Sequence, residues 1–290
     1  MIRRMMSRSL CCALAVLALS LSPLLAQRDA DRRDWLQLFN GKNLEGWTPK
    51  ITGHALGENY ADTFRVENGV LTVAYDKYAT FENTFGHLFY SREKFSYYTL
   101  AAEYRFVGDQ AAGAPAWAVR NNGLMLHSQS PQSMGLNQDF PISLEVQLLG
   151  GAPAPDRTTA NVCTPGTEIF VNGAMVRGHC TNSKSPIYRG DVWVRVEVDV
   201  RGGERLTHRV EGQTVLEYEM PQIGGGSVSN FDPAVKKDGT PLTEGYITIQ
   251  GESHPTEFRK IELLNLSGCM NPASPGYKTY IVHRDDSKCR

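Results

Sequence analysis

The sequence predicts an all-β protein in which two antiparallel sheets pack face to face. Hydrophobic and polar residues alternate with a period of two along several segments, as expected for strands that place one face on a core. Glycine- and asparagine-containing turn signals separate these segments, and helical periodicity does not recur. Many half-buried strands joined by turns are typical of a β-sandwich.

The clearest strand is expected over residues 100–106, with its hydrophobic residues on the core side and Glu103 and Arg105 on the opposite side. The same alternation predicts strands over 123–127, 144–149, 192–200 and 247–250. Turns are expected at Glu67-Asn68-Gly69, Asn121-Asn122-Gly123, Arg201-Gly202-Gly203 and Lys237-Asp238-Gly239.

Three long segments interrupt the strand pattern, at residues 128–140, 150–190 and 222–243. Long loops in a compact domain often carry function, although each could equally be a decoration of the surface.

Composition excludes several classes of protein. The chain has 290 residues, of which 41% are hydrophobic and 21% charged, with a formal net charge of -1. This is ordinary globular composition, without the basic excess of a nucleic-acid-binding protein. We therefore expect no nucleic-acid partner.

Residues 1–26 have the pattern of a secretory signal peptide. Arg3, Arg4 and Arg8 precede a short apolar run over 10–21, and Ala26 is a small residue suited to cleavage. The run is shorter than a membrane span, which needs about 20 residues. We expect a periplasmic or secreted protein with no membrane span after signal removal. We divide the chain into this signal, a lead-in (27–34), a main domain (35–268) and a tail (269–290).

Four cysteines remain after the signal, and an even number in an exported chain favours disulfides. Three pairings are possible. Pairing of sequence neighbours is expected, which gives Cys163–Cys180 in a loop and Cys269–Cys289 in the tail. A zinc site is the alternative, but C-x-x-C and H-x-x-x-H spacings are absent from the sequence.

Polar side chains on several strands suggest a binding site. If strands 100–106, 123–127 and 144–149 belong to one sheet, their polar faces bring together Glu103, Arg105, His127, Glu145 and Gln147. A carboxylate, a guanidinium, an imidazole and an amide on one surface would suit a sugar and would include a candidate base. The alternative is a solvated face held by salt bridges.

A second carboxylate pair, Glu197 and Asp199, has the spacing found in sandwich glucanases. Position 201 is Arg201, so no third acid continues this face. We therefore interpret the pair as a solvated strand face. Phosphate-binding loops and the G-x-S-x-G elbow of acyl hydrolases are absent from the sequence.

Six segments, in order, resemble the DUF1080 family of 3-keto-disaccharide hydrolases, also described as 3-keto-glucoside 1,2-lyase/hydratases. They are LFNGKNLEGW at 38–47, FRVENGVL at 64–71, NNGL at 121–124, SLEVQ at 143–147, GYITIQ at 245–250 and EFRKI at 257–261. The chain departs from the family where a His-Gly pair usually follows the closing Gln strand, because Gly251, Glu252, Ser253, His254 and Pro255 stand there.

The resemblance implies a concanavalin A-like sandwich and a substrate oxidised at C3, a 3-keto glucoside or disaccharide. It also implies a site lined by Glu145, Gln147, Gln250 and Arg259, with His127 and His254 as further candidates. A base, Glu145 or His127, would remove the C2 proton. Arg259 or a divalent metal ion would stabilise the enolate.

Because such sandwiches also host lectins, a non-catalytic carbohydrate-binding module is the alternative function. Trp117 and Trp193 are the aromatic residues that could stack on a sugar in that case. A hydrolase of unmodified glucans is a third interpretation.

Overall fold

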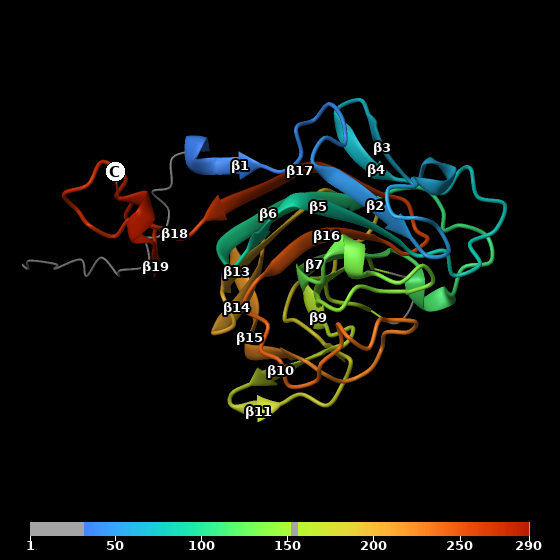
Figure 1. The fold of residues 1–290 in the computed structure, drawn as a ribbon. Helices are drawn as coiled ribbons and strands as arrows, with labels where there is room; N and C mark the ends of the chain where they lie inside the picture. The colour runs from blue at the N-terminus through green and yellow to red at the C-terminus, as the bar shows by residue number, and fades with distance from the viewer. Residues whose placement is uncertain (1–31, 152–155, 290) are drawn as a thin grey trace, which may run out of the picture.

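The computed structural model describes residues 32–151 and 156–289, and these residues form two large sheets packed against each other (Figure 1). Within these ranges the regular structure is strands and short 3-10 turns, without an α-helix. Neighbouring strands in both large sheets run antiparallel. The predicted all-β, concanavalin A-like sandwich is confirmed.

The larger sheet has ten strands. Nine follow one path: β11 (Ala174–Met175), β10 (Thr167–Val171), β15 (Gln213–Ile223), β14 (Arg205–Val210), β13 (Val194–Arg201), β6 (Tyr97–Phe106), β17 (Thr256–Asn265), β4 (Val70–Val73) and β3 (Phe64–Glu67). The tenth, β1 (Trp35–Gln37), pairs with the end of β17, with Trp35 opposite Leu264.

The smaller sheet has seven strands and carries the candidate site. Its order is β12 (Cys180–Thr181), β9 (Asn161–Cys163), β8 (Leu144–Leu149), β7 (Asn121–Ser128), β16 (Gly245–Gly251), β5 (Gly86–Phe95) and β2 (Trp47–Ile51).

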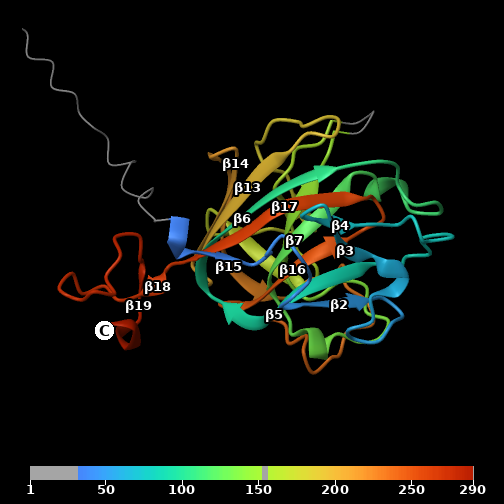
Figure 2. The same cartoon turned by 90° about the horizontal axis from the view of Figure 1, so that it is seen from above.

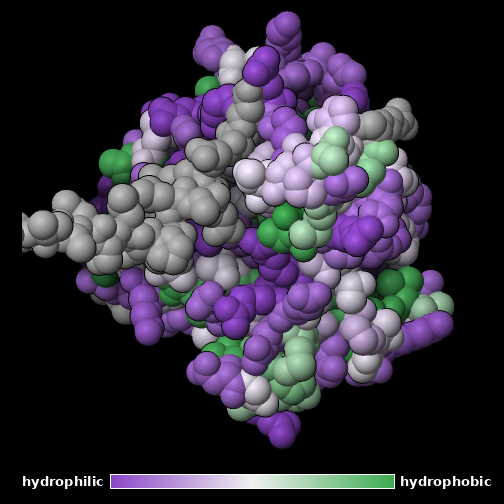
Figure 3. Space-filling view, turned by 90° about the vertical axis from the view of Figure 1, so that its left-hand side faces the viewer, coloured by the Kyte–Doolittle hydropathy of each residue, from purple (hydrophilic) through white to green (hydrophobic). Residues whose placement is uncertain are grey.

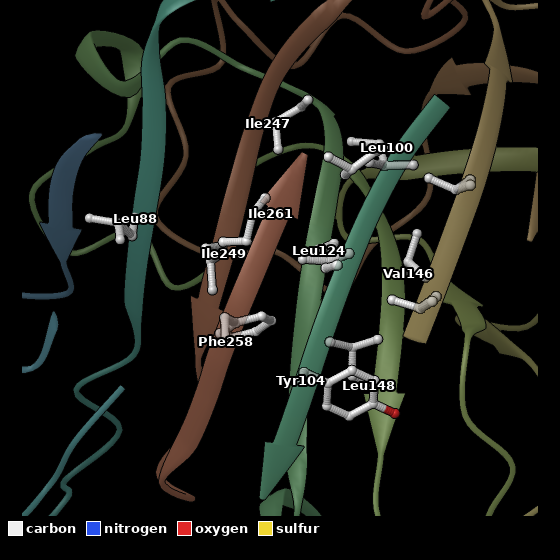
Figure 4. Close-up of a cluster of buried hydrophobic side chains, with 14 of the residues drawn as sticks. Leu88, Leu100, Tyr104, Leu124, Val146, Leu148, Ile247, Ile249, Phe258 and Ile261 are labelled. Carbon is white, nitrogen blue, oxygen red and sulfur yellow. The ribbon is translucent and has the colours of Figure 1, made fainter. Parts of the chain in front are cut away.

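The hydrophobic core lies between the two sheets (Figure 4). Leu100 and Ile261 enter it from the ten-stranded sheet, and Leu124, Val146 and Ile249 enter it from the seven-stranded sheet. Burial of each such side chain is worth about 1.5–3 kcal/mol, which fixes the register of every strand. The alternate residues therefore face outward, and this decides which polar side chains can form a site.

One predicted turn is wrong. Asn68 and Gly69 do form the β3–β4 hairpin, both at positive φ. Asn121-Asn122-Gly123, in contrast, is the beginning of strand β7. The Asn122 side chain donates a hydrogen bond to the Gln250 carbonyl at 2.7 Å, so it joins two neighbouring strands instead of closing a turn.

Both predicted disulfides are present. Cys163–Cys180 joins the paired strands β9 and β12. Cys269–Cys289 closes the tail, where β18 (Ser267–Gly268) and β19 (His283–Arg284) pair in parallel. Seen from above, the tail lies beside one end of the sandwich (Figure 2).

The end of the molecule in Figure 3 is mostly hydrophilic, with separate hydrophobic areas. In the described part of the chain, no helix has the length and apolar character to cross a membrane. The predicted signal, residues 1–26, lies outside the described residues.

Candidate functional site

A cleft of about 460 Å³ opens on the outer face of the seven-stranded sheet. Strands β7, β8 and β9 supply its floor. The three long segments singled out in the sequence supply parts of its wall: Asp139 and Phe140 from the first, Pro165 and His179 from the second, and Ser227, Val228 and Ser229 from the third.

Hydrogen bonds tie these wall segments together. The Ser229 backbone N–H donates to Asp139 Oδ1 at 2.7 Å, and the Gly166 N–H donates to the Gly226 carbonyl at 2.8 Å. The wall is therefore cross-linked between segments that are far apart in the sequence.

Gly123 creates the space at the centre of the floor. A Cβ at this position would lie 2.7 Å from Glu145 Cγ, 2.8 Å from Glu145 Oε1 and 2.9 Å from Gln250 Oε1. Gly123 pairs with Gln147 on the next strand, so the two candidate residues Gln147 and Gln250 flank it. The missing side chain lets Glu145 lean across β7 toward Gln250.

Buried polar atoms without protein partners gather around this point. Glu145 Oε1, Gln250 Oε1, Glu252 Oε2 and Asn121 Oδ1 all lack a hydrogen-bond partner among the described residues. An unsatisfied buried polar group costs about 1–3 kcal/mol. The groups beside this cleft are free to form hydrogen bonds with a polar ligand or with water.

Burial strongly perturbs the two carboxyl groups. It raises the pKa of Glu145, which is 5% exposed, above the usual carboxyl range. Burial and the charge of Glu145 together raise the pKa of Glu252 well above that range, against a hydrogen bond that Gln250 Nε2 donates to Glu252 Oε1 at 2.8 Å. The pair is poised to hold at least one proton near neutral pH.

Aromatic residues form one wall of the cleft. Trp117, in the 3-10 turn Ala116–Ala118, is 54% exposed and lines the cleft. Its ring lies parallel to Phe85, with centroids 6.2 Å apart, and Phe85 contacts Phe140 at 4.8 Å. The cleft thus combines a polar floor with an apolar wall.

Three of the residues predicted for the site lie together: Glu145, Gln147 and Gln250. Gln147 accepts a hydrogen bond from Asn161 Nδ2 at 3.2 Å, which orients its amide. Glu145 lies on the face of β8 that points away from the hydrophobic core, yet its side chain is buried in the site rather than exposed.

The predicted position of His127 is wrong. Between β7 and β16 the register shifts, and the two residues between Met125 and Ser128 on β7 lie opposite the single residue Ile247 on β16. His127 has φ +49 within this bulge. Its ring therefore points to the opposite sheet, where Nε2 lies 3.0 Å from the Gly202 carbonyl, and burial lowers its pKa.

Glu103, Arg105 and Arg259 do not belong to the site. Strands β6 and β17 lie in the ten-stranded sheet, so the expected pooling of their polar faces with Glu145 is wrong. Arg259 pairs with Glu103 at 2.6 Å, and both arginines stack on Trp193, at 4.6 and 4.7 Å from its ring. This cluster is a salt-bridged outer face, which was the alternative interpretation.

Glu197 and Asp199 share that outer face. Glu197 pairs with Arg195 and Asp199 with Arg209, each at 2.7 Å. Both carboxylates are therefore engaged in ion pairs on this face, but Asp199 is buried and not solvated as the sequence suggested.

His254 is buried near Phe106, with ring centroids 5.7 Å apart. It is not among the residues that line the cleft. Burial lowers its pKa to about 4, so the ring is neutral at physiological pH.

Sequence reasoning missed Glu252 and Asn121. Glu252 lies two residues after Gln250 and so follows it on the same face of the strand, which is the signal that could have found it. Asn121 was not identified because the sequence assigns it to a turn and not to a strand face.

Among the described residues, Cys163, His179 and Cys180 bring three ligand-type atoms within 4.8 Å of one another. The two sulfurs form a disulfide, however, and a thiolate is what binds a metal. This group is therefore a part of the cleft wall and not a metal centre.

Residues 34–264 match the model of the 3-keto-alpha-glucoside-1,2-lyase-like domain. Two solved structures of candidate glycosyl hydrolases from Parabacteroides distasonis are similar at 16% identity. They cover 80% and 82% of this chain and 99% and 98% of their own, with TM-scores of 0.46 and 0.49. The carbohydrate-binding module CBM66 from Bacillus subtilis is similar at 11% identity, covering 62% and 82%, with a TM-score of 0.34. No curated protein matches the chain.

Proposed function

We propose that the cleft binds a glucoside carrying a ketone at C3 and catalyses elimination of the group at C1. The premise is that the chain belongs to the 3-keto-alpha-glucoside-1,2-lyase-like family. The observation that carries the proposal is the set of unpartnered oxygens around Gly123, which includes two buried carboxyl groups. Family membership supports a carbohydrate-active domain, and the residues of the cleft supply the groups that this reaction needs.

The C3 ketone makes the reaction accessible to an ordinary carboxylate. It acidifies the hydrogen on C2, because the carbanion that forms delocalises into an enolate. When the enolate collapses, the C1–O bond breaks, and the leaving oxygen takes a proton. Water then adds across the C1–C2 double bond of the unsaturated keto-sugar, and the sum is hydrolysis.

Glu145 is the proposed base. It lies on the floor of the cleft, and its raised pKa makes its carboxylate a stronger base than an exposed one. Glu252, whose pKa is raised by burial and by the charge of Glu145, is the proposed acid that protonates the leaving group. Two carboxyl groups whose environments favour different protonation states are a recurring acid–base arrangement.

Amide groups are the proposed stabilisers of the enolate oxygen. Gln147 and Asn121 both line the cleft. The Gln147 carbonyl accepts from Asn161, which directs its NH₂ group to act as the donor. Arg259 has no part in this assignment, because it lies on the other sheet.

The test incubates the protein with 3-keto-trehalose and, in parallel, with trehalose, both in D₂O. The sugars that form are then analysed. We expect cleavage of the keto-sugar alone, with deuterium at C2 of the 3-keto product beyond that in an enzyme-free control. Cleavage without deuterium at C2 would exclude elimination.

The matched variants are Glu145→Gln and Glu257→Gln, the latter on the outer face of the other sheet, paired with Arg105. A general base contributes about 10²–10⁴-fold, so Glu145→Gln should lose that much of kcat. Glu257→Gln should retain activity. Equal activity of the two variants would remove Glu145 from the mechanism.

The second candidate function is a carbohydrate-binding module, which the exposed Trp117 beside a polar floor favours. A module would bind an unmodified saccharide and leave 3-keto-trehalose intact, so the same experiment separates the two functions.

We also propose a periplasmic or secreted location. Two disulfides are typical of oxidising compartments. The N-terminal sequence of the exported protein, expected near Gln27, tests this location.

A further inference from the structure

The wall of the cleft contains an aromatic surface that the proposed chemistry does not use. Trp117 remains 54% exposed although a large apolar side chain gains free energy by burial. The exposed ring lies in the same cleft as the base, so a bound molecule can cover it.

Trp117 is held in place before any ligand arrives. Arg157 donates to the carbonyls of Trp117 and Val119, at 3.4 and 2.6 Å, and so anchors the turn. Phe85 lies parallel to the ring, 6.2 Å away, and itself contacts Phe81 at 5.3 Å. A fixed aromatic surface binds a flat group at little conformational cost.

Apolar residues other than Trp117 also line the cleft, among the polar residues of the same wall. Phe140, Val228 and Pro165 line the cleft with Trp117, beside the disulfide sulfurs. The oxygens of Asp139, the acidic residue of this wall, already accept from Ser229 and from the Phe140 N–H at 2.8 Å. The wall thus offers a flat, apolar surface next to a polar floor that suits a sugar ring.

We propose that Trp117, Phe140 and Val228 form a subsite for a planar aromatic aglycone, so that the substrates are aryl glucosides oxidised at C3. This inference rests on the proposed function for the reaction, but not for the binding preference. With the sugar ring on the floor near Glu145, the leaving group at C1 would lie against the aromatic wall.

The test measures binding separately from turnover. Calorimetric titration with 4-nitrophenyl glucoside and methyl glucoside, in both anomers and without oxidation, gives the aryl preference directly. Stacking on an aromatic ring is worth about 0.5–1.5 kcal/mol beyond the area buried. Stacking alone therefore gives about a two- to tenfold preference of the wild type for the aryl compound, and the area that the aryl ring buries adds to it.

Trp117→Ala should abolish that preference, and Trp117→Phe should retain most of it. Trp193→Ala is the matched control, since Trp193 lies on the outer face of the other sheet, between two arginines. Its preference should be unchanged. If Trp117→Ala does not fold, Trp117→Leu keeps an apolar side chain without the flat ring and should also lose the preference.

Equal binding of the two glucosides by the wild type, or an aryl preference that survives in Trp117→Ala or Trp117→Leu, would overturn the subsite. An aryl preference that depends on Trp117, combined with no turnover of the 3-keto compounds, would overturn the lyase proposal and leave the subsite standing.

Discussion

Adding one methyl group at Gly123 should inactivate the protein without unfolding it. The new Cβ would lie 2.7 Å from Glu145 Cγ, and 2.8 and 2.9 Å from the Oε1 atoms of Glu145 and Gln250. Ordinary carbon contacts are about 3.5–4.0 Å, so Glu145 must move by roughly 1 Å. A misplacement of that size can cost about 10²-fold in rate.

Stability should respond quite differently. Gly123 lies within β7 and is not among the glycines at positive φ, so alanine suits its backbone. Gly→Ala at such a position stabilises by about 0.4–1 kcal/mol through the unfolded state. Displacing Glu145 opposes this gain, and we expect the free energy of unfolding to change by less than about 1 kcal/mol.

The assay measures kcat/KM on a 3-keto glucoside together with urea denaturation. Gly226→Ala is the control, because nothing lies within 4 Å of its added Cβ. We expect a loss of about 10²-fold for Gly123→Ala and wild-type activity for Gly226→Ala. Full activity of Gly123→Ala would refute the placement of the site.

Three further predictions follow from the assigned roles. Glu252→Gln should lose the alkaline limb of the pH–rate profile, and its rate with a sugar leaving group should fall by about 10²–10⁴-fold. Its rate with a 4-nitrophenol leaving group should fall little, because 4-nitrophenolate leaves without an acid. Equal losses with both leaving groups would contradict the role of Glu252. The acid limb of the Glu252→Gln profile should still report a pKa above the usual carboxyl range. Glu145 must lose its proton to act as the base, and burial raises the pKa of Glu145. Replacing Cys163 and Cys180 by serine should lower the free energy of unfolding by about 3 kcal/mol, measured by urea denaturation. The disulfide closes a loop of 17 residues, and the length of this loop determines how much the disulfide restricts the unfolded chain. His127→Gln should lower stability by about 1–3 kcal/mol through its contact with Gly202 and leave kcat nearly unchanged; a large loss of kcat would restore His127 as a base.

The sequence predicts the strands well, because a strand that buries one face in the core must alternate hydrophobic and polar residues. Leu100 and Val146 both lie in that core, as the alternation requires. Alternation gives only the face of a strand, however, and not the sheet to which the strand belongs. For that reason Glu103 and Glu145 were expected on one surface, although they occupy opposite sheets.

Local irregularities limit the prediction of the site further. The bulge at His127 is invisible to a strict two-residue period, since one extra residue reverses every side chain beyond it. Gly123 had the chemical signature of a turn, yet its role is to leave room beside Glu145. Both effects depend on neighbours that are distant in the chain.

The pairing of the first strand with the last long one has a consequence for the architecture of the chain. Trp35 lies opposite Leu264, so the beginning and end of the sandwich meet at one edge of one sheet. A short linker between them would close the polypeptide into a ring, and new termini could then be opened at an exposed turn such as Asn68-Gly69. The sandwich is therefore a natural candidate for circular permutation and for insertion into a host protein through a single attachment point.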